Sequence, residues 1–262
     1  MTKGDRVAGV LWGLAAGDRI GGPTYMAVCL GESLIDCQSF NLDDISSRYL
    51  TWWRDGAFDT GPTTARVLEL VSSGKTFHEA SFQVDVEAGG LTAGCNPVHR
   101  ATPLAMLALL ADENLPASAM VEAALTHRHS LAGDVSAAAA ILCRALIQGH
   151  SWSVALDMAK VGRQEKTQAA LEIQSLHSLK RDGFAPHVLA AASYFVTTSP
   201  DFDTMMNQAL EFAGLSNYCP VLVGSLGGAR WGASNIHHNW FRENDLLLRV
   251  QKVTESLADM WP

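Results

Sequence analysis

The sequence is short of basic residues. It has 19 Lys and Arg against 27 Asp and Glu in 262 residues, which gives a formal net charge of −8. Binding to nucleic acid depends on Lys and Arg that neutralise phosphates, so we expect no nucleic-acid partner. Hydrophobic residues make up 48% of the chain, which excludes a disordered protein. The length favours a single domain over residues 1–262.

The chain also lacks paired cysteines and long apolar runs. Its five cysteines are scattered without a C-x-x-C pair, which is typical of reduced thiols in the cytoplasm. No run of about 18 consecutive apolar residues occurs, so we expect no membrane span and no membrane partner. Apolar residues 7–17 follow a basic start, as in a signal peptide, but no cleavage site follows. Val7, Leu11 and Leu14 lie at helical spacing and predict an ordinary first helix.

Common catalytic signatures and strand patterns are missing as well. The sequence has no H-E-x-x-H, G-x-G-x-x-G, G-x-S-x-G or Walker A motif. No stretch alternates polar and apolar residues in the way that predicts a strand. Helical periodicity dominates instead, and predicts an all-α domain of about a dozen helices. The clearest of these helices are expected at 63–73, 116–126, 135–148, 188–196, 204–212 and 244–260.

Four loops place small or polar residues directly before a proline that starts a predicted helix. Proline is favoured there because its missing N–H would have no partner in any case. The free N–H groups of a helix start suit a phosphate or another anion, although most helix starts only cap a helix. Because these loops also carry polar side chains, we expect them to contribute to a site. They lie at 21–24, 59–64, 94–97 and 217–220.

Three side chains in or near these loops, and His127 outside them, are candidates for chemistry. Asp18 follows an apolar helix and Asp59 precedes a helix start, so each is either a capping carboxylate or a functional one. Cys219 precedes a proline at a helix start, a setting that lowers a thiol pKa, and is either a nucleophile or a small buried residue. His127 ends a helix. Its spacing of two from His129 argues against a paired metal site.

Four segments of the chain form a more specific pattern. They are AGVLWGLAAGDRIGGPT (8–24), GCNPVHRATP (94–103), THRHSLAGDVSAAAA (126–140) and GLSNYCPVLVGSLGGARWG (214–232). In order and spacing, from about Arg6 to Trp240, they resemble the motifs of the ADP-ribosylglycohydrolase family. Those motifs are a G-x-x-x-G-D-x-x-G helix and loop, an N-G-x-x-M-R-x-x-P segment, a T-H-x-H-x-x-A helix start, and a glycine- and aspartate-rich loop before a helix ending G-A-x-x-G. The resemblance implies the all-α fold of that family.

The resemblance also implies a site at which this chain departs from the family. Members hold two magnesium or manganese ions with a Thr-Asp-Asp triplet, a Glu after the first loop and an Asp-x-Asp-Thr in the last loop. Here Tyr25 stands for the Glu, Asp59-Thr60-Gly61 for the triplet, and residues 216–219 (Ser-Asn-Tyr-Cys) for the last group. Hard dications need carboxylate oxygens, and Asp59 is the only one left as a metal candidate. We therefore expect no metal cofactor, with magnesium bound only if the family site is partly retained.

The implied activity is hydrolysis of an N- or O-glycosidic bond in an ADP-ribosyl or related ribosyl substrate, either a small molecule or an ADP-ribosylated partner. Asp59 would supply the carboxylate beside an oxocarbenium-like transition state, Asp18 or His127 would transfer protons, and Cys219 would serve a covalent route. The alternatives are a pseudoenzyme that binds ADP-ribose and a purely structural use of the fold. The expected substrate-binding residues are Tyr25, Thr60, Gly61, Asn96, Arg100, Ser216, Asn217 and Tyr218.

Overall fold

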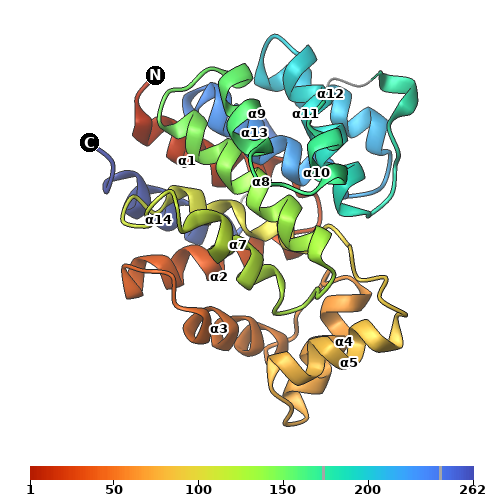
Figure 1. The fold of residues 1–262 in the computed structure, drawn as a ribbon. Coiled ribbons are helices and arrows are strands. Elements are labelled where there is room, and N and C mark those ends of the chain that lie inside the picture. Colours follow the sequence, from red (N-terminus) through yellow and green to blue (C-terminus); the bar gives the residue numbers. More distant parts are fainter. Residues whose placement is uncertain (173–174, 242–243) are drawn as a thin grey trace.

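The structure, a computed structural model, describes residues 1–172, 175–241 and 244–262, and its regular elements are helices joined by turns and loops (Figure 1). The described part has no strand, only an isolated bridge between Gly94 and Phe184. The predicted all-α class is confirmed. The helices are α1 (Lys3–Gly17), α2 (Gly22–Cys37), α3 (Leu42–Arg54), α4 (Pro62–Ser72), α5 (Phe77–Glu87), α6 (Asn96–Arg100), α7 (Leu115–Ala123), α8 (Ser130–Ile147), α9 (Trp152–Lys160), α10 (Glu165–Ala170), α11 (Ala185–Thr198), α12 (Phe202–Ala213), α13 (Pro220–Trp231) and α14 (Asp245–Ala258), with short 3-10 helices at Thr102–Met106, Leu176–Ser178, Ala233–Asn235 and His238–Trp240.

Helix α8 runs through the middle of the molecule and is buried along nearly all of its length (Figure 1). By length and composition alone it could cross a membrane, although Asp134 and Arg144 interrupt its apolar sequence. In the structure, however, 89% of this helix lies inside the protein, as expected for a helix that is apolar all round. Its two charged side chains are both compensated: Asp134 pairs with Arg163, and Arg144 pairs with Asp112.

Helices α1 and α13 cross antiparallel with their backbones in contact. The contact is possible because both helices present glycines at four-residue spacing, so no side chain separates them. A Cβ added to Gly13 would lie 2.0 Å from the carbonyl oxygen of Gly224. Gly9 and Gly17 face Gly228 and Pro220 at similar distances. The contact brings the end of α1 beside the start of α13, two segments that lie some two hundred residues apart in sequence.

The four proline loops start helices, as predicted. Pro23, Pro62, Pro97 and Pro220 each occupy the first turn of α2, α4, α6 and α13, respectively. The other predicted helices are found with shifted ends: α8 begins five residues before the predicted 135–148 and ends one residue earlier, and 244–260 is found as α14.

Candidate functional site

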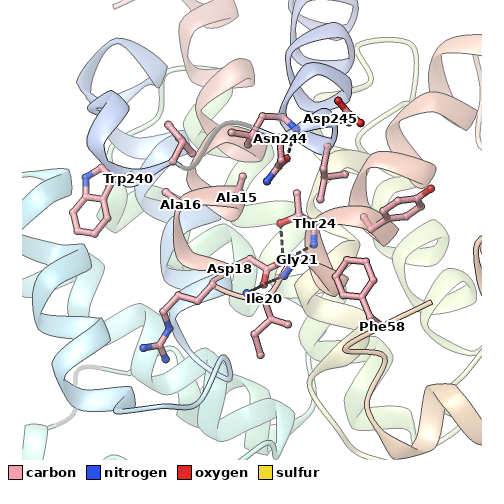
Figure 2. A pocket seen from close by; sticks show the side chains of 15 residues that line it. Ala15, Ala16, Asp18, Ile20, Gly21, Thr24, Phe58, Trp240, Asn244 and Asp245 are labelled. Atoms are coloured by element: carbon pink, nitrogen blue, oxygen red, sulfur yellow. Dashed lines mark hydrogen bonds between the residues drawn. The ribbon is translucent and has the colours of Figure 1, made fainter. Parts of the chain in front are cut away.

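The carboxylate of Asp18 closes the start of α2. One oxygen, Oδ1, accepts hydrogen bonds from the backbone N–H of Ile20 (3.2 Å) and Gly21 (2.9 Å). The other, Oδ2, accepts from the backbone N–H (2.8 Å) and the hydroxyl (2.7 Å) of Thr24 (Figure 2). Because the N-cap residue Gly21 has no side chain, Asp18 satisfies N–H groups that a capping side chain would otherwise bind. The capping interpretation of Asp18 is confirmed. These hydrogen bonds also fix the position of the Asp18 carboxylate.

Asn217, in the loop before α13, joins Asp18 to Asp59. Its Nδ2 donates to Oδ1 of Asp18 at 2.8 Å and to Oδ2 of Asp59 at 3.4 Å. Its Oδ1 accepts the backbone N–H of Arg19 at 3.3 Å. The Arg19 guanidinium also donates to the carbonyls of Gly214 and Ser216. Arg19 therefore holds the loop of Asn217 against the end of α1.

Asp59 is half-buried and has φ +51°, a left-handed conformation that is uncommon for residues other than glycine. Burial raises its pKa above the usual value, and the negative charge of Asp18 raises it further. Hydrogen bonds from Asn217 and from the backbone of Gly22 partly oppose this shift. A Cβ on Gly22 would lie 2.5 Å from the Asp59 carbonyl oxygen, so the close approach of the two loops requires glycine there.

The third loop joins the second through Asn96. Its Nδ2 donates to the carbonyl of Thr60 at 2.6 Å. Gly61 has φ +70°, and a Cβ at this position would lie 2.8 Å from Nδ2 of Asn96. Thr60 is buried, whereas Gly61 and Asn96 are half-buried. The structure thus brings Asp59, Asn96 and Asn217, each from a different proline loop, into one connected group with Asp18, which precedes the first loop.

A cleft of about 660 Å³ opens beside Asp18 (Figure 2). Tyr25 and Phe58 line one side of it, and the other side comes from the distant segment that leads into α14. That second wall was missed by the sequence analysis, because no motif links it to the proline loops. It consists of Trp240, Phe241 and residues 244–247.

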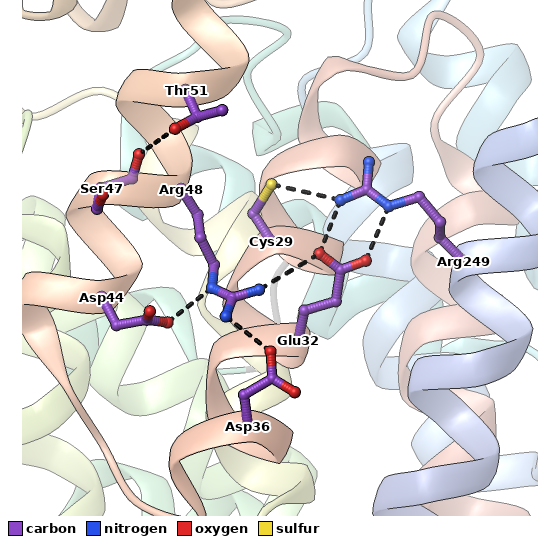
Figure 3. A network of polar contacts seen from close by, with 8 residues as sticks. All are labelled: Cys29, Glu32, Asp36, Asp44, Ser47, Arg48, Thr51 and Arg249. Atoms are coloured by element: carbon purple, nitrogen blue, oxygen red, sulfur yellow. Dashed lines mark hydrogen bonds and ion pairs between the residues drawn. The ribbon is translucent and has the colours of Figure 1, made fainter.

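The ring of Tyr25 is fixed from both faces. It stacks on Trp52, with ring centroids 5.1 Å apart and an interplanar angle of 15°, and the Arg249 guanidinium lies 4.4 Å from its centroid. Arg249 in turn makes two hydrogen bonds of 2.8 Å to the carboxylate of Glu32 (Figure 3). Arg48, from α3, pairs with Glu32 and with two further carboxylates. The network locks α14, α2 and α3 together at the wall of the cleft.

The expected role of Arg100 in substrate binding is not supported, because its side chain is fully buried. Its Nε donates to Oε1 of Glu122 at 2.6 Å, and neither side chain is exposed at all. Tyr49 donates to the same oxygen at 2.9 Å, and Thr126 accepts from Nη2 of Arg100 at 2.9 Å. The charge of Arg100 is thus neutralised inside the protein. Glu122 and Tyr49 are structural residues that no sequence pattern indicated.

Cys219 and His127 are also enclosed. The Cys219 side chain is 4% exposed, and its sulfur lies 3.9 Å from the carbonyl oxygen of Ala209. Burial raises the pKa of its thiol to about 12, so the expected lowering by the helix start is wrong. His127 is 3% exposed, and its Nδ1 lies 2.9 Å from the hydroxyl of Thr126. Burial, helped by the charge of Arg100, lowers the pKa of His127 to about 3.

The remaining expected residues, Ser216 and Tyr218, lie on either side of Asn217 in its loop. The hydroxyl of Ser216 accepts the backbone N–H of Tyr218 at 3.2 Å, so it is used within the loop. The Tyr218 side chain is exposed, and its carbonyl lies 2.6 Å from Nε2 of the buried His99. Of the residues set against the family's Asp-x-Asp-Thr, Asn217 is therefore the one that contacts both carboxylates.

The neutral state of buried His127 predicts acid sensitivity. In the unfolded chain, His127 binds a proton below its ordinary pKa of 6.5. In the folded protein it binds that proton only near pH 3. Stability therefore falls as the pH is lowered, by about 2 kcal/mol between pH 7 and pH 5 for this one residue. Urea denaturation at both pH values should show a smaller loss for His127→Asn. The exposed His150→Asn should behave as wild type, and a variant at position 127 with an unchanged loss would contradict the assignment.

The donor set around Asp18 does not fit a pair of divalent cations. In the described ranges, no three His, Cys, Asp or Glu side chains gather as a metal site would require. A carboxylate offers about four lone-pair positions, and Asp18 already accepts five hydrogen bonds. Asn217 turns N–H groups, not oxygens, toward the two carboxylates. Tyr25, which replaces the family's Glu, has its ring stacked and supplies no carboxylate.

Comparisons with known proteins agree with this fold. Residues 23–261 match the model of the family described as ADP-ribosylglycohydrolase. The chain is 22% identical to the ADP-ribosyl-(dinitrogen reductase) glycohydrolase of Rhodospirillum rubrum, covering 94% of this chain and 83% of that protein. It is also 22% identical to the ADP-ribosylarginine hydrolase Tri1 of Pseudomonas putida (strain GB-1), over 98% and 79% of the two chains.

A solved structure titled as an ADP-ribosylglycohydrolase-related protein complex matches 98% of both chains, with a TM-score of 0.78 and 24% identity. At that identity the likeness shows the fold, while the family match over most of the chain shows the membership. Both agree with the four motifs and with the helical architecture around the proline loops. The chain belongs to the ADP-ribosylglycohydrolase family.

Proposed function

We propose that the protein hydrolyses the N- or O-glycosidic bond between a ribose and its acceptor in an ADP-ribosyl or related ribosyl substrate, without the dinuclear metal site of its family. The observation that carries the proposal is the pair Asp18 and Asp59, joined through Asn217, with Asp18 in the lining of the cleft. Membership of a hydrolase family supports the reaction type. The free thiols of all five cysteines agree with a cytoplasmic setting.

The two carboxylates have different environments, which suggests different roles. Five donors face Asp18, the environment of a carboxylate anion, so Asp18 would stabilise positive charge on the ribose in the transition state. Asp59 has a raised pKa and would protonate the leaving group as the bond to ribose breaks. It would then take a proton from the water that adds to the ribose. His127 and Cys219 are left out of this scheme because both are enclosed.

The class of substrate is inferred from relatives. Their names identify the protein of R. rubrum as acting on ADP-ribosyl dinitrogen reductase and Tri1 as acting on ADP-ribosylarginine. We propose that this chain also acts on an ADP-ribosylated substrate. The aromatic side chains Phe58 and Trp240 at the cleft suit a ligand with planar groups.

Calorimetry with ADP-ribose, followed by turnover of ADP-ribosylarginine, tests the proposal. We expect Asp59→Asn to lower kcat by at least about 100-fold, the scale of a lost general acid, with little change in the affinity for ADP-ribose. The exposed Asp55→Asn is the matched control and should leave both quantities unchanged. Full turnover by Asp59→Asn would exclude Asp59 as the acid.

A pseudoenzyme that binds ADP-ribose is the second candidate. It is favoured by Tyr25, Ser216 and Tyr218, which stand where the family pattern has carboxylates. Wild-type protein that binds ADP-ribose but turns over no ribosyl substrate would support it. Absence of binding with both magnesium and EDTA would contradict both candidates.

A further inference from the structure

Both ends of the Asn217 amide make hydrogen bonds. A primary amide has two N–H donors and one carbonyl acceptor. Here Nδ2 contacts Asp18 and Asp59, and Oδ1 accepts the backbone N–H of Arg19. Since a backbone N–H can only donate, the carbonyl side of the amide must face Arg19, and the NH₂ must face the two carboxylates. The hydrogen-bond partners thus determine the orientation of the amide.

Without the shared donor Nδ2 of Asn217, the carboxylates of Asp18 and Asp59 would repel each other. The negative charge of Asp18 is felt at Asp59, which is half-buried at φ +51°. No Lys or Arg forms an ion pair with either carboxylate among the pairs found in the described residues. The electropositive group that lies between them is therefore the neutral NH₂ of Asn217.

We propose that Asn217 takes the place of a divalent cation in this chain: its NH₂ joins Asp18 to Asp59, and so assembles the site without metal. The inference concerns how the carboxylate pair of the proposed function is held together. Its test needs no catalysis, so a failure of the proposed hydrolysis would leave it standing.

The experiment titrates Mn²⁺ into wild type, Asn217→Asp and Ser216→Asp. Asp at 217 replaces the bridging N–H groups with oxygens and turns three carboxylates toward one point. We expect Mn²⁺ to bind this variant at least about tenfold more tightly than wild type, because affinity rises with the number of carboxylate ligands. Ser216→Asp adds the same charge one residue away, at a position that the family pattern gives to a carboxylate. The Ser216 hydroxyl is turned into its own loop, so this control should bind Mn²⁺ no better than wild type.

Thermal unfolding gives a second readout. The Tm of wild type should be the same in EDTA and in Mn²⁺. Asn217→Asp should have a lower Tm than wild type in EDTA and should regain it in Mn²⁺, because a cation relieves the repulsion of three carboxylates. Should this variant not fold, the wild-type measurements alone decide. Micromolar Mn²⁺ binding or an EDTA-sensitive Tm in wild type would overturn the inference, as would equal Mn²⁺ binding by the two Asp variants.

Discussion

Replacing Glu122 with leucine should lower the free energy of unfolding by about 3–5 kcal/mol, the cost of leaving a buried charge without its partner. Arg100 is completely enclosed and cannot lose its proton, so its charge has no other means of neutralisation. Tyr49 would lose the acceptor of its hydroxyl at the same time. Urea denaturation at pH 7 measures the effect. The exposed pair Arg66–Glu87 provides the control, and Glu87→Leu should change the stability little.

The double variant Arg100→Met/Glu122→Leu separates structure from function. It replaces the buried pair by apolar groups, so it should regain most of the stability lost in Glu122→Leu. If Arg100 is structural, as its burial indicates, the double variant should bind ADP-ribose as wild type does. A double variant that folds but does not bind would restore Arg100 to the substrate-binding residues. A Glu122→Leu protein as stable as wild type would contradict the importance of the pair.

The helices could be predicted because their ends carry local signals. Pro62 and Gly74 bracket the predicted helix 63–73, and the structure has α4 at Pro62–Ser72. Such signals depend only on the backbone of a few neighbouring residues, so they can be recognised in the sequence without knowledge of the fold. Asp59 and Asn217 were identified for a related reason, since each is a polar residue in a loop just before a proline helix start, and Asp18 was identified because it directly follows an apolar helix.

The errors concern side-chain direction and burial, which depend on distant parts of the chain. Arg100 lies in a family-like motif, but Glu122 from α7 draws its side chain inward. The helix-start argument for Cys219 was sound locally, yet its burial has the larger effect on the pKa. The wall of the cleft at Trp240 could not be predicted either, because it meets the proline loops only through packing of the whole fold.

A large packing effect should come from Gly13→Ala in α1. The new methyl would lie 2.0 Å from the carbonyl oxygen of Gly224, a backbone atom that cannot move without displacing α13. Alanine is favoured over glycine within helices by about 1 kcal/mol, yet we expect a net loss of about 3 kcal/mol, because overpacking at a backbone contact forces the helices apart. Gly4→Ala on the same helix is the control. Its methyl would lie 3.7 Å from Ala258, an ordinary contact, so it should be neutral or slightly stabilising.

The same variant should weaken the site, because α1 carries Asp18 and α13 follows Asn217. Their hydrogen bond spans 199 residues of sequence, and the helix contact is what brings its two partners within 2.8 Å. Calorimetry should therefore show weaker ADP-ribose binding in Gly13→Ala and unchanged binding in Gly4→Ala, at a temperature where both remain folded. Unchanged binding in Gly13→Ala would mean that the Arg19 clamp on the loop before α13 positions Asn217 without the helix pair.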